Sequence, residues 1–451
     1  MRPRPGIVAA LAFTAAACDG SRETAISSQQ PLAAQMAFRP SVDPTPANNP
    51  YPTFALSADY PDTQPVACLP ADCPWLAMSV SFTGTRAPAW NTGGWDRYLA
   101  SIFEYVKQGQ DLKTTGWMAQ VGGKTRWFHV PWQAYRSDVG REFIHGMTNE
   151  RSTTAFDFAG TSVVADTFQS WAVGMYNERG GWTIGKLIPK SGPQAGVPQP
   201  TNNGALPFPE GTVVAKILFT SATADAYPFL TGSPEWMANI HDGNDTTGSL
   251  RFPQPIHLVQ MDVAVTDRRS PSGWVFGTFV YNGLRKGATP WDNMQPLGLM
   301  WGNDPQSWPA VNLSASQPLL QSVLAPFPQG TAIYEHLGCG PSSGNPDTPG
   351  LQYRLAGPVD NRASSCVACH QTAFTPYTPT PADTGPTYKR TPPLMPAQSC
   401  TDSNRVGQAQ YLRTLRYPAA YWDKPGSASL DFSLQLRGAF ISYTDWAARK
   451  P

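Results

Sequence analysis

The spacing of apolar residues along the chain predicts helices in three places. The clearest helical pattern covers residues 95–107, where four large apolar side chains recur every three or four positions: Trp95, Leu99, Ile102 and Val106. Two further helical patterns lie near the end of the chain, over 406–415 and 437–448. The predicted helices are therefore short and far apart in the sequence.

Runs of β-branched and aromatic residues predict an antiparallel sheet. The three strongest strand candidates lie at 212–220, 257–266 and 274–281. A polar seven-residue turn joins the last two, as in an antiparallel meander. Two glycine-containing turns predict further hairpins: Gly122-Gly123 between 116–121 and 125–130, and Gly180-Gly181 between 170–176 and 182–188.

The composition favours a mainly β fold with long connections. The 451 residues include 39 glycines and 46 prolines, which favour turns and short strands over a helical bundle. We therefore expect an α+β, mainly β, chain: an antiparallel β-sheet or sandwich body with long loops, followed by a C-terminal segment with short helices. The formal net charge is only +1, and basic residues do not cluster, so nucleic acid is not an expected partner.

The first 18 residues have the pattern of a secretory signal. Arg2 and Arg4 precede an apolar stretch over 7–13, which is too short for a permanent membrane helix. Small residues before Cys18 resemble the bacterial lipoprotein signal, in which the cysteine becomes the lipidated first residue. The alternative is simple cleavage near Ala17. We expect a periplasmic or cell-envelope protein that meets the membrane only through a lipid anchor at Cys18.

One five-residue motif carries most of the chemical information. Cys366-Val-Ala-Cys369-His370 has the Cys-x-x-Cys-His spacing that attaches c-type haem. Two thiols one helical turn apart can each form a thioether with the same porphyrin, and the adjacent histidine supplies an axial imidazole to the iron. A structural zinc half-site would need a second ligand pair, and a thioredoxin-like pair would need a flanking βαβ pattern. Neither is evident, so the sequence predicts one covalently attached haem c.

Several residues compete to be the sixth iron ligand. Leu394-Met395-Pro396-Ala397 resembles the Met-Pro-Ala segment of class I cytochromes c, and this resemblance makes Met395 the first candidate. His336 and Met300 are competing candidates, and an open iron position is a further alternative. We interpret the other histidines as structural: His129, His145, His241 and His257.

These features divide the chain into four parts. Residues 1–17 form the expected signal peptide, and 18–50, rich in Ser, Gln, Ala, Pro and Asn, form a flexible tether. A β-rich domain is expected over 51–345, and the C-terminal region 346–451 is expected to bind haem c. Prolines are frequent between 342 and 400, so little regular structure is expected there.

The β region resembles a family of β-sheet cytochromes. The runs Phe208–Lys216 and Gly273–Phe279, followed by Cys-x-x-Cys-His, are similar over about 206–375 to cytochrome c-prime-beta and its hydroxylamine-oxidising relatives. The resemblance implies an all-β domain around a five-coordinate haem c and, in the oxidising branch, a lysine cross-link to the porphyrin. Strand alternation allows Lys216 to face inward, towards the haem. The interpretation we favour is a lysine that reaches solvent from an edge strand.

Other runs resemble a group of bacterial secreted haem proteins over most of the mature chain: 171–174, 298–305 and 357–361. This likeness implies no activity. Two functions therefore compete. The first is a monohaem cytochrome that passes single electrons between periplasmic partner proteins. The second is a β-sheet haem enzyme, an oxidoreductase, or a gas-binding protein that acts on a small nitrogen compound such as hydroxylamine or nitric oxide.

The seven cysteines divide by expected role. Cys18 is assigned to lipid and the haem motif takes two, which leaves four: Cys68, Cys73, Cys339 and Cys400. Four cysteines allow three pairings. Cys68 and Cys73 lie in one short proline-bearing loop, so we expect them to pair, and Cys339 and Cys400 to bridge across the haem motif. The alternative is that these cysteines are buried thiols.

Overall fold

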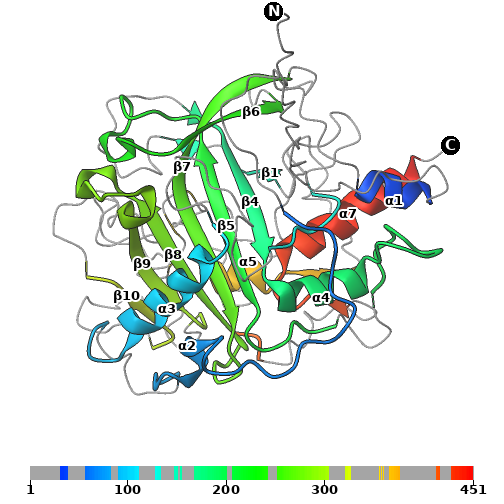
Figure 1. Ribbon diagram of the computed structural model, residues 1–451, viewed down its shortest axis with the longest axis horizontal. Coiled ribbons are helices and arrows are strands. Elements are labelled where there is room, and N and C mark those ends of the chain that lie inside the picture. Colours follow the sequence, from blue (N-terminus) through cyan, green and yellow to red (C-terminus); the bar gives the residue numbers. More distant parts are fainter. Residues whose placement is uncertain are drawn as a thin grey trace, which may run out of the picture.

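The described residues are built around one antiparallel β-sheet of eight strands (Figure 1). The computed structural model describes residues 31–38, 56–82, 90–110, 127–133, 147–150, 153–154, 167–200, 206–241, 251–303, 320–326, 355, 357, 359, 365–375, 413–416 and 428–449. Seven strands follow one another across the sheet: β1 (Met147–Asn149), β4 (Ser170–Tyr176), β5 (Val213–Thr220), β7 (Arg251–Thr266), β8 (Trp274–Tyr281), β9 (Met294–Met300) and β10 (Ser322–Leu324). The eighth, β6 (Glu235–His241), pairs with the first half of β7. The expected α+β, mainly β, fold is confirmed.

Three strands predicted from the sequence form the centre of this sheet. β5, β7 and β8 correspond to the runs predicted at 212–220, 257–266 and 274–281, and β7 pairs with β8 as the expected meander. Every residue of β4 and of β8 is buried. The reason is that helices cover both faces of the sheet, so side chains that point to either side lie in a core.

One face of the sheet packs against α2 (Pro74–Ala77) and α3 (Trp95–Lys107), as Figure 1 shows. Leu99 and Ile102 of α3 share a buried cluster with Ile217 of β5 and Val263 of β7. The helix predicted over 95–107 is therefore confirmed, with the same bounds. Its apolar residues line one side of the helix, which is the side that the sheet buries.

The buried cluster on the opposite face includes residues of four other helices: α1 (Leu32–Ala37), α4 (Glu178–Leu187), α5 (Cys366–His370) and α7 (Leu434–Ala448). Val367 of α5 and Leu436 of α7 belong to the same buried cluster as Phe276 of β8. The Cys-x-x-Cys-His region thus shares a core with the sheet. α7 confirms the helix predicted over 437–448 and begins three residues earlier.

The hairpin predicted around Gly180-Gly181 is wrong in its second half. Residues 170–176 form β4, but 178–187 form the helix α4 instead of a turn and a strand. The side chain of Asn177 caps the helix by accepting a hydrogen bond from the Gly180 backbone N–H. A Cβ at Gly181 would lie 2.7 Å from the Phe128 ring, so glycine permits close packing here and does not mark a turn.

The helix predicted over 406–415 is wrong at its C-terminal end. Of the helix predicted over 406–415, the described residues 413–415 are irregular. Their backbone groups bond to side chains from elsewhere, since Asn303 donates to the Arg413 carbonyl and Gln371 accepts from the Leu415 N–H. Most of the hairpin predicted around Gly122-Gly123 lies outside the described residues.

Smaller elements complete the description. Two-stranded ladders join β2 (Thr153–Thr154) to β3 (Thr167–Phe168) and β11 (Phe374–Thr375) to β12 (Ala428–Ser429). Within the described ranges, three short 3₁₀ turns, η2, η3 and η4, cover Pro228–Leu230, Gly283–Arg285 and Pro290–Asn293. Among the ranges described above, no helix combines the length and the apolar character needed to cross a bilayer.

Candidate functional site

The Cys-x-x-Cys-His motif forms the short helix α5, on the face of the sheet opposite to α3. Ser365 caps this helix, because its Oγ accepts a hydrogen bond from the Ala368 N–H. The same hydroxyl donates a hydrogen bond to the Asn303 Oδ1 at 2.5 Å. Val367 and Ala368 are the buried residues of this helix, and Val367 belongs to the buried cluster on this face of the sheet. These contacts fix one side of α5 and leave its two cysteines and its histidine half-buried.

Cys366 and Cys369 are thiols, one helical turn apart. The Cys366 Sγ lies 3.2 Å from the Leu355 carbonyl oxygen, which also accepts the Cys366 backbone N–H. Because both side chains keep some exposure, two thioether bonds to one porphyrin are compatible with the position of α5.

His370 is held in one tautomer by a long-range hydrogen bond. Its Nδ1 lies 2.8 Å from the carbonyl oxygen of Phe432, and a carbonyl oxygen can only accept a hydrogen bond. Nδ1 therefore carries the proton, and Nε2 keeps a lone pair, which is the form of imidazole that can bind a metal ion. Desolvation lowers the pKa of His370 to about 4, so the imidazole is neutral at pH 7. The Phe276 ring packs against it, with 4.8 Å between ring centroids.

The carbonyl partner comes from the turn between β12 and α7. β11, which follows α5, pairs with β12, and the Leu430 N–H donates to the Ala373 carbonyl at 2.9 Å. This pairing brings the turn beside the motif. Ser433 then caps α7 by accepting a hydrogen bond from the Leu436 N–H. The motif and its partner turn thus meet through one short ladder.

Lys216 does not lie on an edge strand, so that interpretation was wrong. β5 is flanked by β4 and β7, and Lys216 pairs in register with Gly174 and Asp262. Its Nζ forms an ion pair with the Glu150 Oε2 at 3.3 Å, and each of these two side chains is 26% exposed. Local alternation indicates on which face of its own strand Lys216 lies, but the order of strands in the sheet depends on tertiary pairing.

The Lys216–Glu150 pair lies on the same face of the sheet as α5. Phe276, which touches His370, is connected by register through Ala264 to Val214, and Lys216 is two residues further along β5. Both charges act on His370, since Lys216 lowers and Glu150 raises its pKa. The pair is therefore close enough to influence the imidazole.

An amide of α7 completes this polar region. The Gln435 Nε2 would lie 1.6 Å from a Cβ at Gly174, so the amide occupies the space that a side chain there would fill. Within the part of the chain that the structure describes, the buried amide oxygen and nitrogen of Gln435 make no hydrogen bond. Sequence reasoning missed Glu150 and Gln435, and no local signal could have revealed them. Asp262, which pairs in register with Lys216, could have been noticed from the sequence, because it is a carboxylate within an otherwise apolar strand.

One of the proposed sixth ligands lies in the described part of the chain. Met300 is buried in β9, directly opposite Phe276 in register, and so on the face that holds α5. Met395 and His336 lie outside the described residues, as do the expected lipidation site and the second expected disulfide: Cys18, Cys339 and Cys400.

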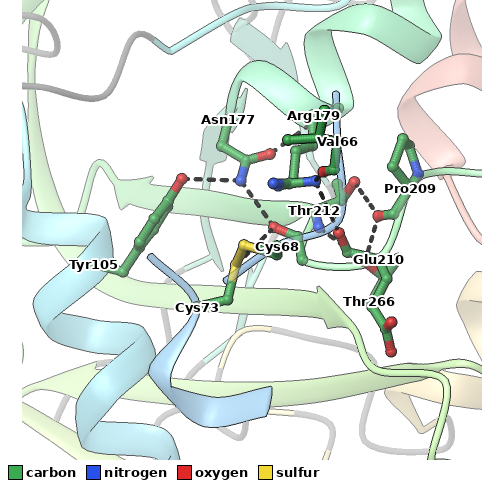
Figure 2. The surroundings of a disulfide bond; sticks show 12 residues. Val66, Cys68, Cys73, Tyr105, Asn177, Arg179, Pro209, Glu210, Thr212 and Thr266 are labelled. Atoms are coloured by element: carbon green, nitrogen blue, oxygen red, sulfur yellow. Dashed lines mark hydrogen bonds between the residues drawn. A yellow bond between two sulfur atoms is a disulfide. The ribbon is translucent and has the colours of Figure 1, made fainter. Parts of the chain in front are cut away.

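The predicted Cys68–Cys73 disulfide is confirmed (Figure 2). It packs against the turn before β5, where a Cβ at Gly211 would lie 2.7 Å from the Cys73 Sγ. Asn177 ties the same turn to α3, because its amide nitrogen donates to the Gly211 carbonyl and to the Tyr105 hydroxyl. The disulfide fastens its loop to the sheet at a distance from α5, on the face that carries α3.

Two of the histidines interpreted as structural, His129 and His257, have side chains that the structure describes. The Nδ1 of buried His129 lies 3.3 Å from the Val130 carbonyl, and His257 lies 3.7 Å from Glu235. In the described ranges, no three His, Cys, Asp or Glu side chains gather in a way that could hold a metal ion. The donor set that fits a cofactor is that of α5: two thiols and one imidazole.

No protein-family model, curated protein or solved structure matches the chain.

Proposed function

We propose that this chain is a monohaem c-type cytochrome, with haem c attached through Cys366 and Cys369 and with His370 as an axial ligand to the iron. The observation that carries the proposal is the hydrogen bond from His370 Nδ1 to the Phe432 carbonyl. This hydrogen bond leaves Nε2 available, and histidines that bind metals through one ring nitrogen typically donate a hydrogen bond from the other.

The residues around the motif suit this role. Ser365 and the buried Val367 hold α5 in place, while the two thiols lie one turn apart and half-exposed. Bound haem supplies a one-electron ferric/ferrous couple. The chain orients the imidazole, keeps it neutral and shields it with Phe276. The function that follows is single-electron transfer with redox partner proteins in the periplasm, where lipid on Cys18 would anchor the chain.

Covalent attachment is tested by expressing the full chain in a bacterium that matures c-type cytochromes. The purified protein should keep its haem on a denaturing gel, and the Cys366→Ser/Cys369→Ser variant should lose it. A matched control is Cys68→Ser/Cys73→Ser, which also removes two cysteines but lies on the other face of the sheet. Wild-type protein without covalent haem, in a host that matures a control cytochrome, would refute the proposal.

A second candidate is a haem enzyme or gas-binding protein for a small nitrogen compound. The observation that favours it is the polar region formed by Lys216, Glu150 and Gln435 beside α5. An electron carrier needs no such groups near its haem, whereas a ligand that binds at the iron needs hydrogen-bond partners. Optical spectra with carbon monoxide separate the two candidates. Prompt binding supports the second candidate, and a low-spin spectrum that carbon monoxide does not change supports the first.

A further inference from the structure

The turn that supplies the carbonyl to His370 is strained. Asp431 and Phe432 are consecutive, and both adopt left-handed backbone conformations, with φ of 45° and 66°. Residues with side chains rarely adopt this conformation, and they keep it only where the surrounding structure holds them. Two such residues in a row therefore need an anchor.

The carboxylate of Asp431 provides this anchor. One oxygen accepts the Phe208 backbone N–H at 2.8 Å, and the other accepts the Trp274 indole N–H at 3.1 Å. Asp431 is only 4% exposed, so these two bonds replace water around the carboxylate. Trp274 is the first residue of β8, and Phe208 lies in the segment that leads to β5. The turn is thus fixed to the sheet through one side chain.

The same strand also positions the ring of His370. Trp274 and Phe276 are two residues apart on β8 and point to the same face of the sheet. The Trp274 indole N–H donates to the carboxylate of Asp431, the residue before the Phe432 carbonyl that accepts from His370, and Phe276 packs on the imidazole. β8 therefore sets the distance between the imidazole and the carbonyl that accepts its hydrogen bond.

We propose that Asp431 is a positioning residue that sets the reduction potential of the haem through His370. By fixing the Phe432 carbonyl, it keeps the hydrogen bond from His370 Nδ1–H to that carbonyl short, and a strong hydrogen bond there makes Nε2 a more basic ligand. A more basic ligand favours the ferric state and lowers the potential. This inference rests on the proposed function and adds to it a residue that touches neither the haem motif nor the iron.

The test compares midpoint potentials of the haem-loaded full chain. Asp431→Asn keeps the shape and suits the left-handed conformation, but an NH₂ group then faces one of the two N–H donors. We expect the variant to keep its covalent haem and to show a higher midpoint potential than the wild type. The matched control is Asp267→Asn, which alters another buried carboxylate, bound to Tyr98 and Arg269 near the other face of the sheet. Its potential should be that of the wild type.

A second variant keeps the proposal testable if Asp431→Asn does not fold. Trp274→Phe removes one of the two donors to the carboxylate without changing a residue of the turn itself, and we expect a smaller shift in the same direction. Unchanged potentials in the folded variants overturn the proposal, as does an equal shift in Asp267→Asn. A wild type without covalent haem is a different result, because it refutes the proposed function instead.

Discussion

The Nδ1 of His370 lies 2.8 Å from the carbonyl oxygen of Phe432, a residue 62 positions further along the chain. The donor is the last residue of α5, and the acceptor belongs to the turn before α7. The ladder between β11 and β12 brings the two together. A motif that the sequence confines to five residues thus depends on a distant turn for the orientation of its imidazole.

Without haem, His370 should make the chain less stable in acid. Its folded pKa is about 4, and its unfolded value is near 6.5. Between these values the unfolded chain binds a proton that the folded chain excludes, so the free energy of unfolding decreases as the pH falls from 6.5 to 4, by at most about 3 kcal/mol. Urea unfolding of Cys366→Ser/Cys369→Ser at several pH values measures this. Adding His370→Gln should make the decrease smaller, and an unchanged pH dependence would contradict the prediction.

Removing the Cys68–Cys73 disulfide should lower stability without affecting haem attachment. A crosslink that closes so short a loop contributes about 2 kcal/mol, mainly by restricting the unfolded chain. Urea unfolding of Cys68→Ser/Cys73→Ser should show a loss of this size. A reducing agent that leaves haem attached should destabilise the wild type but not the variant. Equal sensitivity of both proteins to the reducing agent would argue against the disulfide.

Gly211→Ala should destabilise the chain for two reasons. Gly211 has a φ of +81°, and the new Cβ would also lie 2.7 Å from the Cys73 Sγ. The control is Gly192→Ala, because Gly192 has a φ of +83° but no atom within 4 Å of the added Cβ. The control should cost about 1 kcal/mol, which is the strain of the left-handed conformation alone.

The additional loss in Gly211→Ala measures its contact with the disulfide. It should become smaller in the Cys68→Ser/Cys73→Ser background, because the serine oxygen is smaller than sulfur. A double-mutant cycle from unfolding experiments gives this coupling. Equal losses for Gly211→Ala and Gly192→Ala would rule out the contact.

Two methionine variants should identify the sixth iron ligand. If Met395 closes the haem, Met395→Leu should produce a high-spin spectrum that carbon monoxide changes promptly. Met300→Leu should keep the wild-type spectrum and lose less than about 1.5 kcal/mol of stability, because it replaces one buried apolar residue with another of similar volume. The opposite pattern would assign the ligand to Met300, which lies opposite Phe276 in register.

Local patterns predicted several elements of the fold. α3 was predicted from its apolar period of about 3.6 residues, and β5 and β8 were predicted from runs of β-branched and aromatic residues, which strands favour. The same reasoning failed for α4, where Gly180-Gly181 resembled a turn. Those glycines instead allow close packing, Gly180 against Tyr176 and Gly181 against Phe128. Phe128 belongs to a distant segment of the chain, and a contact of that kind leaves no period in the sequence.

The sequence by itself determined which reactive residues α5 carries, two cysteines and a histidine in Cys-x-x-Cys-His spacing, and it predicted the Cys68–Cys73 pair. Both depend on residues a few positions apart, whose separation follows from local backbone geometry. Only the tertiary structure decided that Lys216 lies on a central strand with Glu150, and that His370 donates to Phe432. These partners are distant in sequence, and they meet because strand pairing and the burial of two apolar faces bring them together.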